Sequence, residues 1–550
     1  MSRITELFMQ LNRGSLGAVQ NGSQLSELSQ YLNVDRLIEN NIKNHMNAIQ
    51  ENGGGLVLLI GNAGDGKSHI ISKLKASGAY NDFEFYNDAT ASCSPKTSSI
   101  ETIKMVLRNF DDNHIESTNK KMFLAINLGK LNEFVDDVNF SKISEIAKNV
   151  LSDRYVECDQ KSYLRYISFS NQQNFELVQD GTDYPIDSFF ISTVLDKITH
   201  MDDSNPFYRA FLDTAFASGE MYPEVINFKL LSLPSVKNSI TKMIIEAIVR
   251  FQLIFTPRDF FDFICSIIVF PFSGSYKEQQ HFFESLLPTL LFEGTACKIQ
   301  RAINRLDPLR VSSSDHNREL SNLFTAYRLE KQFLDEKELG DIYKDLKMKI
   351  DFYYCNHGKD TERISKFVFR LNHLLKYDSE SQEYKNYLIY LSRYNSVNTR
   401  YDVINELEDM INLCIPRHYG AYLEAGDLVP LNIQGSKYRL FARIDKEMVD
   451  ADAPYLGNNK NEFLLYIPLK WKVKGNPIEL KMDFQLFEYL SSLEKGKLAI
   501  TYESELNIEF SRFIRELIKN SASDKEVIII SSDNKHLSLK SKINNAITLS

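Results

Sequence analysis

Residues 56–68 of this 550-residue chain read Leu56-Val57-Leu58-Leu59-Ile60-Gly61-Asn62-Ala63-Gly64-Asp65-Gly66-Lys67-Ser68. The apolar run of residues 56–60 is typical of a strand buried on both faces, as in a parallel sheet covered by helices. Residues 61–68 fit the pattern GxxxxGK[ST], which would arise by chance in about 2% of chains of this length. Together the two features predict a phosphate-binding loop between a buried strand and a helix.

The residue types of this loop each have a chemical reason. Gly61, Gly64 and Gly66 let the backbone turn tightly, so that successive N–H groups point at phosphate oxygens. Lys67 is long enough to reach the β- and γ-phosphates, and the Ser68 hydroxyl can complete a Mg²⁺ shell. The helix that follows adds its positive end. The sequence therefore predicts that the chain binds a nucleoside triphosphate with Mg²⁺.

Strand and helix patterns alternate on either side of the loop. A helical spacing of apolar residues runs over 25–51 and ends at three glycines, which will not continue a helix. Further on, the patterns predict helices at 67–77, 97–110 and 140–151 and buried strands at 83–86, 122–126 and 163–169. This alternation indicates βαβ units and a parallel sheet.

The remainder of the chain changes character twice. Residues 235–425 have an almost wholly helical pattern, in which Thr256-Pro257 marks a helix start. Beyond residue 426, strands are expected at 438–441, 463–467, 470–474 and 527–530. The predicted fold class is an α/β P-loop NTPase, a parallel sheet with flanking helices, followed by an all-helical region and a smaller strand-rich C-terminal module. The expected domains are an N-terminal helical segment (1–52), a P-loop NTPase domain (53–234), a helical domain (235–425) and a mixed strand-rich module (426–550).

Hydrolysis of a triphosphate also needs an acid that orients the metal and a group that positions water. Asn127 follows the strand at 122–126, where signal-transduction and AAA-like NTPases carry an aspartate, and Glu133 is the next acid. Asp88 follows the strand at 83–86 on the carboxyl edge, where ligand-facing residues lie. Asp88 and Glu133 are equal candidates for the catalytic acid, and Asp88 is expected beside Ser68 at the metal. Either carboxylate is equally well explained as an exposed loop residue.

Two further polar residues are candidates for contact with the γ-phosphate. Asn171 ends the expected fourth strand, and Arg258 stands at the helix start Thr256-Pro257. For both residues the sequence favours a plainer interpretation, a surface amide for Asn171 and a surface salt bridge for Arg258.

Residues 58–69, which end at His69, combine with Asn87-Asp88-Ala89-Thr90 into a pattern that resembles the DptF proteins of bacterial DNA phosphorothioation-dependent restriction. Residues 34–36, 125–129 and 306–308 are similar as well. The resemblance is densest over residues 30–310. It implies an ATP-binding component, with residues 61–69 holding ATP and Mg²⁺, of a complex that restricts DNA lacking the sulfur modification. The implied partners are DptG and DptH, and DNA is reached through the complex.

Composition narrows the class of protein. The formal charge of −9 argues against a chain that is basic throughout, such as a histone. Six cysteines lie far apart with no CxxC pair, which favours reduced, mostly buried thiols in a cytoplasmic protein. No signal peptide is expected at the first residues. The most apolar stretch, 260–272, is too short to span a membrane and holds Asp262, so a buried helix is expected there.

Two stretches of the C-terminal module have residue types that can act on or bind DNA. Residues 479–481 have the ExK form of many metal-dependent nucleases, but no convincing aspartate precedes them, so no nuclease activity is assigned to this chain. Residues 470–474 alternate lysine with Trp471 and Val473, which would place three lysines on one face of a strand. Such a face can lie against DNA phosphates. A half-buried strand kept soluble by lysine is the favoured interpretation.

Three functional hypotheses follow. The first is an ATPase component of a bacterial DNA defence complex, in which ATP and Mg²⁺ order the loop, the acids and the helical region. The second is a nucleotide-gated signalling or scaffold protein whose assembly depends on ATP binding and whose hydrolysis is weak, which Asn127 keeps open. The third, a small-molecule kinase, suits the loop but neither the chain length nor the long helical region.

Overall fold

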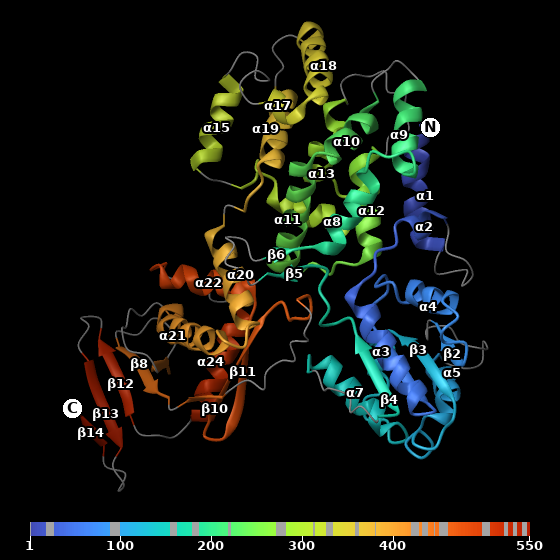
Figure 1. The fold of residues 1–550 in the computed structure, drawn as a ribbon. Helices are drawn as coiled ribbons and strands as arrows, with labels where there is room; N and C mark the ends of the chain where they lie inside the picture. The colour runs from blue at the N-terminus through green and yellow to red at the C-terminus, as the bar shows by residue number, and fades with distance from the viewer. Residues whose placement is uncertain are drawn as a thin grey trace. The chain divides into compact units, whose positions relative to one another are not determined.

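A computed structural model shows that the chain forms two compact units (Figure 1). Unit 1 contains Met1–Glu176 and Asp187–Asp378, and unit 2 contains Leu177–Ile186 and Ser379–Ser550. The structure describes residues 2–17, 27–87, 99–154, 162–178, 186–217, 222–270, 282–311, 314–325, 334–357, 362–379, 381–419, 428–431, 438–444, 446–449, 460–497, 507–521, 526–531, 536–541 and 547–549. Whether the four segments expected from the sequence fold as separate domains stays a prediction.

Unit 1 contains a four-stranded parallel sheet in the order β2-β3-β1-β4 (Figure 1). The sheet and the helices around it are α3 (Leu37–Glu51), β1 (Gly55–Ile60), α4 (Lys67–Ala76), β2 (Phe83–Tyr86), α5 (Ser99–Val106), the 3₁₀ turn η1 (Leu107–Asn109), β3 (Lys121–Ile126), α6 (Leu128–Asn132), α7 (Ser141–Leu151) and β4 (Leu164–Ser168). The expected parallel sheet with flanking helices is thus confirmed, and the expected helix at 97–110 is α5 continued by η1.

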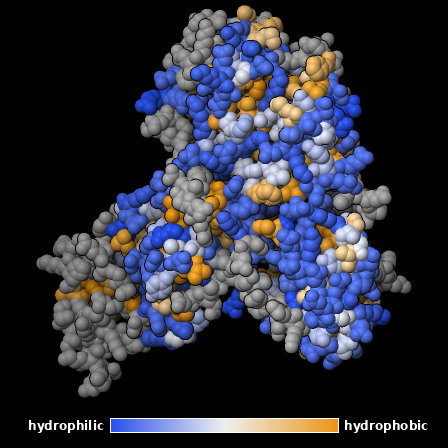
Figure 2. All heavy atoms as spheres, viewed as in Figure 1, coloured by the Kyte–Doolittle hydropathy of each residue, from blue (hydrophilic) through white to orange (hydrophobic). Residues whose placement is uncertain are grey.

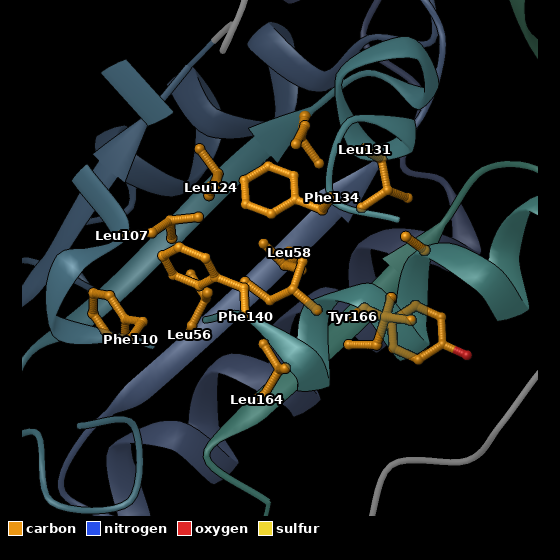
Figure 3. Close-up of a cluster of buried hydrophobic side chains, with 14 of the residues drawn as sticks. Leu56, Leu58, Leu107, Phe110, Leu124, Leu131, Phe134, Phe140, Leu164 and Tyr166 are labelled. Carbon is orange, nitrogen blue, oxygen red and sulfur yellow. The ribbon is translucent and has the colours of Figure 1, made fainter. Parts of the chain in front are cut away.

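Strand β1 lies inside the sheet, and all six of its residues are buried. Because side chains alternate along a strand, Leu56 and Leu58 join a cluster with residues of α5, α6 and α7 on one face. Figure 3 shows this cluster, in which the rings of Phe134 and Phe140 meet edge to face with centroids 5.7 Å apart. Val57 and Leu59 join residues of α3 and α4 on the other face. Helices on both faces explain why β1 is a continuous apolar run.

Residues 25–51 do not form one helix, as their apolar spacing suggested. The structure has α2 (Glu27–Tyr31) and then α3, with a non-helical segment at 33–36 between them. Arg36 has extended dihedral angles, φ −96° and ψ 146°. Leu32 and Val34 are nevertheless buried, so the apolar pattern reflects burial correctly. The helix is interrupted because polar side chains of this segment bind neighbouring helices, as described below.

The helical part of unit 1 confirms the helical pattern predicted from residue 235 onward. Its elements, with the N-terminal helix, are α1 (Arg3–Gly17), α8 (Phe189–Thr199), α9 (Pro206–Ala217), α10 (Pro223–Leu231), α11 (Pro234–Phe251), α12 (Pro257–Ile268), η3 (Phe283–Ser285), α13 (Leu287–Glu293), α14 (Lys298–Ile303), η4 (Asn304–Leu306), α15 (Ser314–Thr325), α17 (Glu336–Leu339), α18 (Asp341–His357) and α19 (Glu362–Leu375). Helix α1 packs against α9 and α12. The N-terminal helix therefore belongs to the helical part of the unit.

Unit 2 combines helices with antiparallel sheets. Its elements are α20 (Gln382–Tyr394), α21 (Arg400–His418), β7 (Leu428–Pro430), β8 (Tyr438–Arg443), β9 (Glu447–Met448), β10 (Ile467–Val473), β11 (Asn476–Met482), α22 (Phe484–Glu494), α24 (Ile508–Ser521), β12 (Glu526–Ser531), β13 (His536–Ser541) and β14 (Ile547–Leu549). The sheets have the orders β11-β10-β9 and β14-β13-β12-β8-β7. A short pair, β5 (Glu176–Leu177) and β6 (Ile186–Asp187), lies at the unit boundary. Figure 2 shows the hydropathy of one face of the chain.

Two details of unit 2 differ from expectation. The strand expected at 463–467 is wrong, because only Ile467 belongs to β10, which continues unbroken to Val473. Phe463 is buried without strand pairing, so its apolar neighbourhood was misread as a strand. Lys474 lies in the hairpin turn with φ 51°, so it does not continue the strand face of Lys470 and Lys472. Trp471 and Val473 are buried while Lys470 and Lys472 are not, which agrees with the favoured half-buried strand, and the alternative of DNA contact stays untested.

The described cysteines and apolar helices bear on the expected thiols and on the expected buried helix at 260–272. Cys265, Cys297, Cys355 and Cys414 are free thiols. Among the helices that the structure describes, none has the length and apolar character needed to cross a membrane. Helix α12 ends at Ile268, and its side chains Phe260, Phe263 and Ile264 are fully buried, which confirms a buried helix over the start of the 260–272 stretch.

Candidate functional site

The glycine-rich loop leaves the carboxyl end of β1 and leads directly into α4. Strands β1 and β3 pair in register up to Ile60 and Ile126, and the Gly61 N–H donates to the Ile126 carbonyl at 3.2 Å. Gly64 and Gly66 have φ of 96° and 88°, which side chains with a Cβ rarely adopt. Gly66 is the N-cap residue of α4. The loop thus lies at the carboxyl edge of a parallel sheet and at the positive end of a helix.

Lys67 and Ser68 begin α4 with their side chains turned toward the loop and toward β2. The Lys67 ammonium donates to the carbonyls of Gly61 at 2.7 Å and Asn62 at 2.6 Å. The Ser68 hydroxyl donates to Oδ1 of Asn87 at 3.2 Å, immediately after β2. Asn62 and Ala63 are exposed on the loop. The lysine therefore folds over the loop, and a phosphate group would have to replace these carbonyls as its partner.

Asp65 closes the loop on itself. Its Oδ2 accepts the Asn62 N–H at 2.5 Å, and a Cβ at Gly61 would lie 2.7 Å from the same oxygen. Burial raises the pKa of the Asp65 carboxyl, although Lys67, the Asn62 hydrogen bond and Arg36 act in the opposite direction. The Asp65 carboxylate thus accepts a backbone N–H of the loop that could otherwise donate to a phosphate oxygen.

The raised pKa of Asp65 predicts a pH-dependent effect of Asp65→Asn on stability. Because the folded state binds the proton more tightly than the unfolded state, the charged carboxylate opposes folding above its folded pKa. We expect Asp65→Asn to raise the melting temperature at pH 7, and the gain to shrink as pH falls toward the ordinary value of 3.8. Thermal melting at pH 7 and pH 4.5 measures this.

Asp82→Asn is the matched control, because the Lys121 hydrogen bond lowers the pKa of the Asp82 carboxyl. That substitution should lower the melting temperature slightly at pH 7, the opposite sign. A loss of stability in Asp65→Asn at pH 7 would show that the hydrogen bond to Asn62 outweighs the burial of the carboxylate.

Asn127 lies next to the loop, at the end of β3. It is the N-cap residue of α6, and its Oδ1 accepts the Lys130 N–H at 2.8 Å. Glu133 is the C-cap residue of the same short helix, is exposed, and pairs with Lys130 at 2.5 Å. The structure therefore places Asn127 at the edge of the loop and shows Glu133 engaged with a lysine of its own helix.

Asp88, the other candidate acid, lies outside the described residues. The residue before it, Asn87, is described, is exposed, and accepts the hydrogen bond from Ser68. The end of β2 is therefore within reach of the first turn of α4. In the described part of the chain, no group of three or more His, Cys, Asp or Glu side chains could hold a metal ion.

His69 faces away from the loop and toward the segment before α3. Its Nε2 lies 3.0 Å from Oδ1 of Asn33, and burial lowers the pKa of its imidazole, to which the charge of Arg36 contributes. The structure thus gives His69 a partner in the interior of unit 1, and direct contact with a nucleotide stays a prediction.

Arg36 is a residue at this site that the motif pattern did not single out. A Cβ at Gly66 would lie 2.8 Å from Nη2 of Arg36. Its guanidinium also lies over the ring of Phe169, 5.2 Å from the centroid, and that ring packs against Gly61. The only sequence signal was its place in the fragment 34–36 shared with DptF proteins, because tertiary contacts of a residue 30 positions from Gly66 leave no local pattern.

The N-terminus of α12 also meets the loop. A Cβ at Gly64 would lie 2.8 Å from Oγ1 of Thr256. Thr256 and Asp259 form a capping box, and Asp259 pairs with Lys298 at 2.7 Å. Arg258 is half-buried in the first turn of α12 and forms no ion pair with another described residue, so the expected surface salt bridge is absent there. The helical part of unit 1 thus contributes a helix start beside the loop, with Arg258 in its first turn.

Asn171 follows β4, whose register with β1 runs to Ile60 and Ser168. It is half-buried, and its Oδ1 is enclosed without a hydrogen-bond partner in the described part of the chain. The surface amide favoured from the sequence is therefore not what the structure shows, because Asn171 continues from a strand that borders the loop strand.

No protein-family model, curated protein or solved structure matches this chain.

Proposed function

We propose that the chain binds ATP with Mg²⁺ in the loop of residues 61–68. The observation that carries this proposal is the position of the loop, which joins the carboxyl end of a buried parallel strand to the positive end of α4. Lys67 already lies over the loop and Ser68 begins the helix. These residue types in this place are suited to a phosphate chain and a hard cation.

Ser68 and Asp88 are proposed to hold the metal. The Ser68 hydroxyl and the side-chain Oδ1 of Asn87 lie together at the end of β2, and oxygen atoms are the ligands that Mg²⁺ prefers. When bound there, Mg²⁺ would supply positive charge that offsets the negative charge of the phosphate chain. The Ser68–Asn87 contact favours the end of β2, and so Asp88, over Glu133, whose carboxylate is paired with Lys130.

Asn127 is proposed to donate to the γ-phosphate. Its Oδ1 is used as the cap of α6, which leaves the Nδ2 group as a donor beside the loop. In that state the side chain is not suited to bind a metal or to take a proton from water. Arg258 is proposed to add positive charge from α12.

The cellular role follows from the resemblance to DptF proteins. We propose an ATP-binding or ATP-hydrolysing component of a DNA phosphorothioation-dependent restriction complex that acts on unmodified DNA, with DptG and DptH as partners. One residue favours a second function, a scaffold whose assembly requires ATP binding and which hydrolyses ATP only weakly. Asn127, which cannot accept a proton as a carboxylate does, stands where an acid is usual.

ATP turnover by the purified chain, with and without duplex DNA, separates these two functions. Turnover that DNA stimulates supports the ATPase component, and tightly bound ATP without turnover supports the scaffold. Wild-type chain that neither binds nor hydrolyses ATP would contradict both.

The metal assignment predicts different effects for the two candidate acids. We expect Asp88→Asn to raise the Mg²⁺ concentration needed for half-maximal ATP binding by about 10- to 100-fold, as loss of a metal-site partner does. Glu133→Gln, which removes the ion pair with Lys130, should leave that Mg²⁺ concentration unchanged. A Mg²⁺ titration of ATP binding measures both, and the reverse order of effects would assign the metal to Glu133.

A further inference from the structure

The segment between α2 and α3 brings an arginine to the phosphate loop from outside the loop motif. Arg36 is the last residue before α3, and its guanidinium lies against Gly66, with Nη2 2.8 Å from where a Cβ would be. The aromatic face of Phe169 supports the guanidinium from the side of Gly61. The guanidinium therefore lies against the end of the loop that leads into α4, and the ring that supports it packs against the other end.

Helix α4 holds the segment in place from one side. The Asn33 amide oxygen meets the His69 ring, and Asp35 and Glu39 both pair with Lys73, Glu39 at 2.6 Å. Since α4 begins at the loop, these contacts tie the segment to the helix whose N-terminus would face a phosphate. Only 5% of Glu39 is exposed, so that pair is mostly shielded from water.

Helix α8 holds the segment from the other side. The Lys197 ammonium donates to the carbonyls of Tyr31 at 2.9 Å and Asn33 at 2.6 Å, and the Tyr31 hydroxyl donates to the Lys197 carbonyl at 2.8 Å. A segment bound on two sides loses little further freedom when a ligand arrives, so Arg36 is preorganised at the loop.

The charge of Arg36 has no direct carboxylate partner among the described residues. The nearby carboxylates of Glu39 and Asp65 act on its charge, but they bind Lys73 and the Asn62 N–H directly. Burial lowers the pKa of the Arg36 guanidinium, which nonetheless stays charged because arginine does not deprotonate in proteins. A half-buried cation with an aromatic support and free donors is suited to an anion.

We propose that Arg36 binds the phosphate chain of the nucleotide held in the loop, an inference that rests on the proposed function. Its planar fork can donate two parallel hydrogen bonds to phosphate oxygens, which a base or a sugar hydroxyl would not use as well. The loop motif then supplies backbone N–H groups and Lys67, and the segment before α3 supplies a second cation.

Arg36→Met and Arg36→Gln test this proposal, since both remove the charge and the first keeps an apolar stem against Phe169. We expect each to weaken ATP·Mg²⁺ binding by about 10- to 100-fold, the range of a partly buried charge-assisted hydrogen bond. The affinity of these variants for inorganic tripolyphosphate, measured by competition against a fluorescent ATP analogue, should fall by a similar factor. Arg36→Lys should recover part of the affinity, because it restores the charge without the fork.

Arg108→Met is the matched control. Arg108 is exposed in η1, the turn after α5, and a helix that follows a parallel strand returns toward the amino edge of the sheet, away from the loop. The Arg108→Met variant should therefore bind ATP with the affinity of the wild type. Melting temperatures of the nucleotide-free variants show whether each one folds, and either neutral Arg36 variant that folds is sufficient for the test.

The other outcomes contradict the proposal in distinguishable ways. Wild-type affinity in a folded Arg36→Met or Arg36→Gln chain would overturn it while leaving the loop function intact. A loss for ATP with none for tripolyphosphate would show that Arg36 contacts the nucleoside and overturn the phosphate assignment. A wild-type chain that binds neither ligand would remove the proposed function itself.

Discussion

Lys67→Ala is expected to reduce ATP binding at least about 100-fold and to abolish any turnover. Lys67 is the cation of the loop motif, and its ammonium is already positioned over the loop by the carbonyls of Gly61 and Asn62. Bound phosphates would replace these carbonyls, so the variant loses a charge-assisted contact to each phosphate that the ammonium reaches. Isothermal titration with ATP·Mg²⁺, together with phosphate release, measures both effects.

Lys75→Ala is the control for this experiment. Lys75 lies on the same helix, is exposed, and stacks over Phe85 with its ammonium 5.6 Å from the ring centroid. It should bind ATP normally. If Lys67→Ala binds ATP as tightly as Lys75→Ala, residues 61–68 are a glycine-rich turn without a nucleotide, and the proposed function fails.

Arg370→Met is expected to destabilise unit 1 by about 3–5 kcal/mol, because it leaves a buried carboxylate without its partner. The Arg370 guanidinium donates to both oxygens of Asp307, at 3.1 and 2.6 Å, and to Glu293 at 2.6 Å. Only 1% of Asp307 is exposed. Burial acts to lower the pKa of the Arg370 guanidinium, but these contacts outweigh it and raise the pKa, and they join α19 to the end of η4. Urea unfolding followed by circular dichroism measures the loss.

A more exposed pair, in which an arginine also donates to both oxygens of one carboxylate, supplies the control. Arg393 donates to both oxygens of Glu406 at 2.9 and 2.7 Å, but both side chains are about a third or more exposed. Arg393→Met should therefore cost about 1 kcal/mol or less. Adding Asp307→Leu to Arg370→Met should recover most of the stability, since the pair is then replaced by apolar side chains. Equal losses for Arg370→Met and Arg393→Met would show that burial does not set the energy of the pair.

The Asp307–Arg370 pair also gives a structural reason for one fragment of the DptF-like pattern. Residues 306–308 entered the resemblance only as sequence. In the structure, Asp307 accepts the Leu309 N–H as well as both donors of Arg370, and so ends η4 and anchors α19. A structural role in folding therefore accounts for Asp307.

The sheet of unit 1 could be predicted closely from local pattern. The expected strands at 83–86, 122–126 and 163–169 agree with β2, β3 and β4 to within one residue at each end. A strand covered by helices on both faces needs an uninterrupted apolar run, and the glycines after β1 need conformations that few other residues adopt. Both requirements are met by neighbouring residues, so both can be recognised in the sequence.

The features that the sequence did not predict depend on contacts between residues far apart in the chain. The helix expected over 25–51 is broken because Asn33, Asp35 and Arg36 bind residues of α4 and the loop, and that competition has no local signature. Asn127 stands where an acid is usual, and the structure adds that its side-chain Oδ1 caps α6, while its role toward a nucleotide stays a prediction. Whether a side chain binds a ligand or its own backbone depends on where the next helix begins.

The loop, the strand before it and the helix after it thus follow from thirteen consecutive residues, because turn geometry and strand burial act over short distances. The surroundings of the loop do not. Thr256 reaches Gly64, Arg36 reaches Gly66, and Phe169 reaches Gly61 only because packing of the helical part and of β4 brings distant residues to one edge of the sheet. Those contacts are set by the burial of side chains that are far apart in the chain, and they determine which charges a nucleotide would meet.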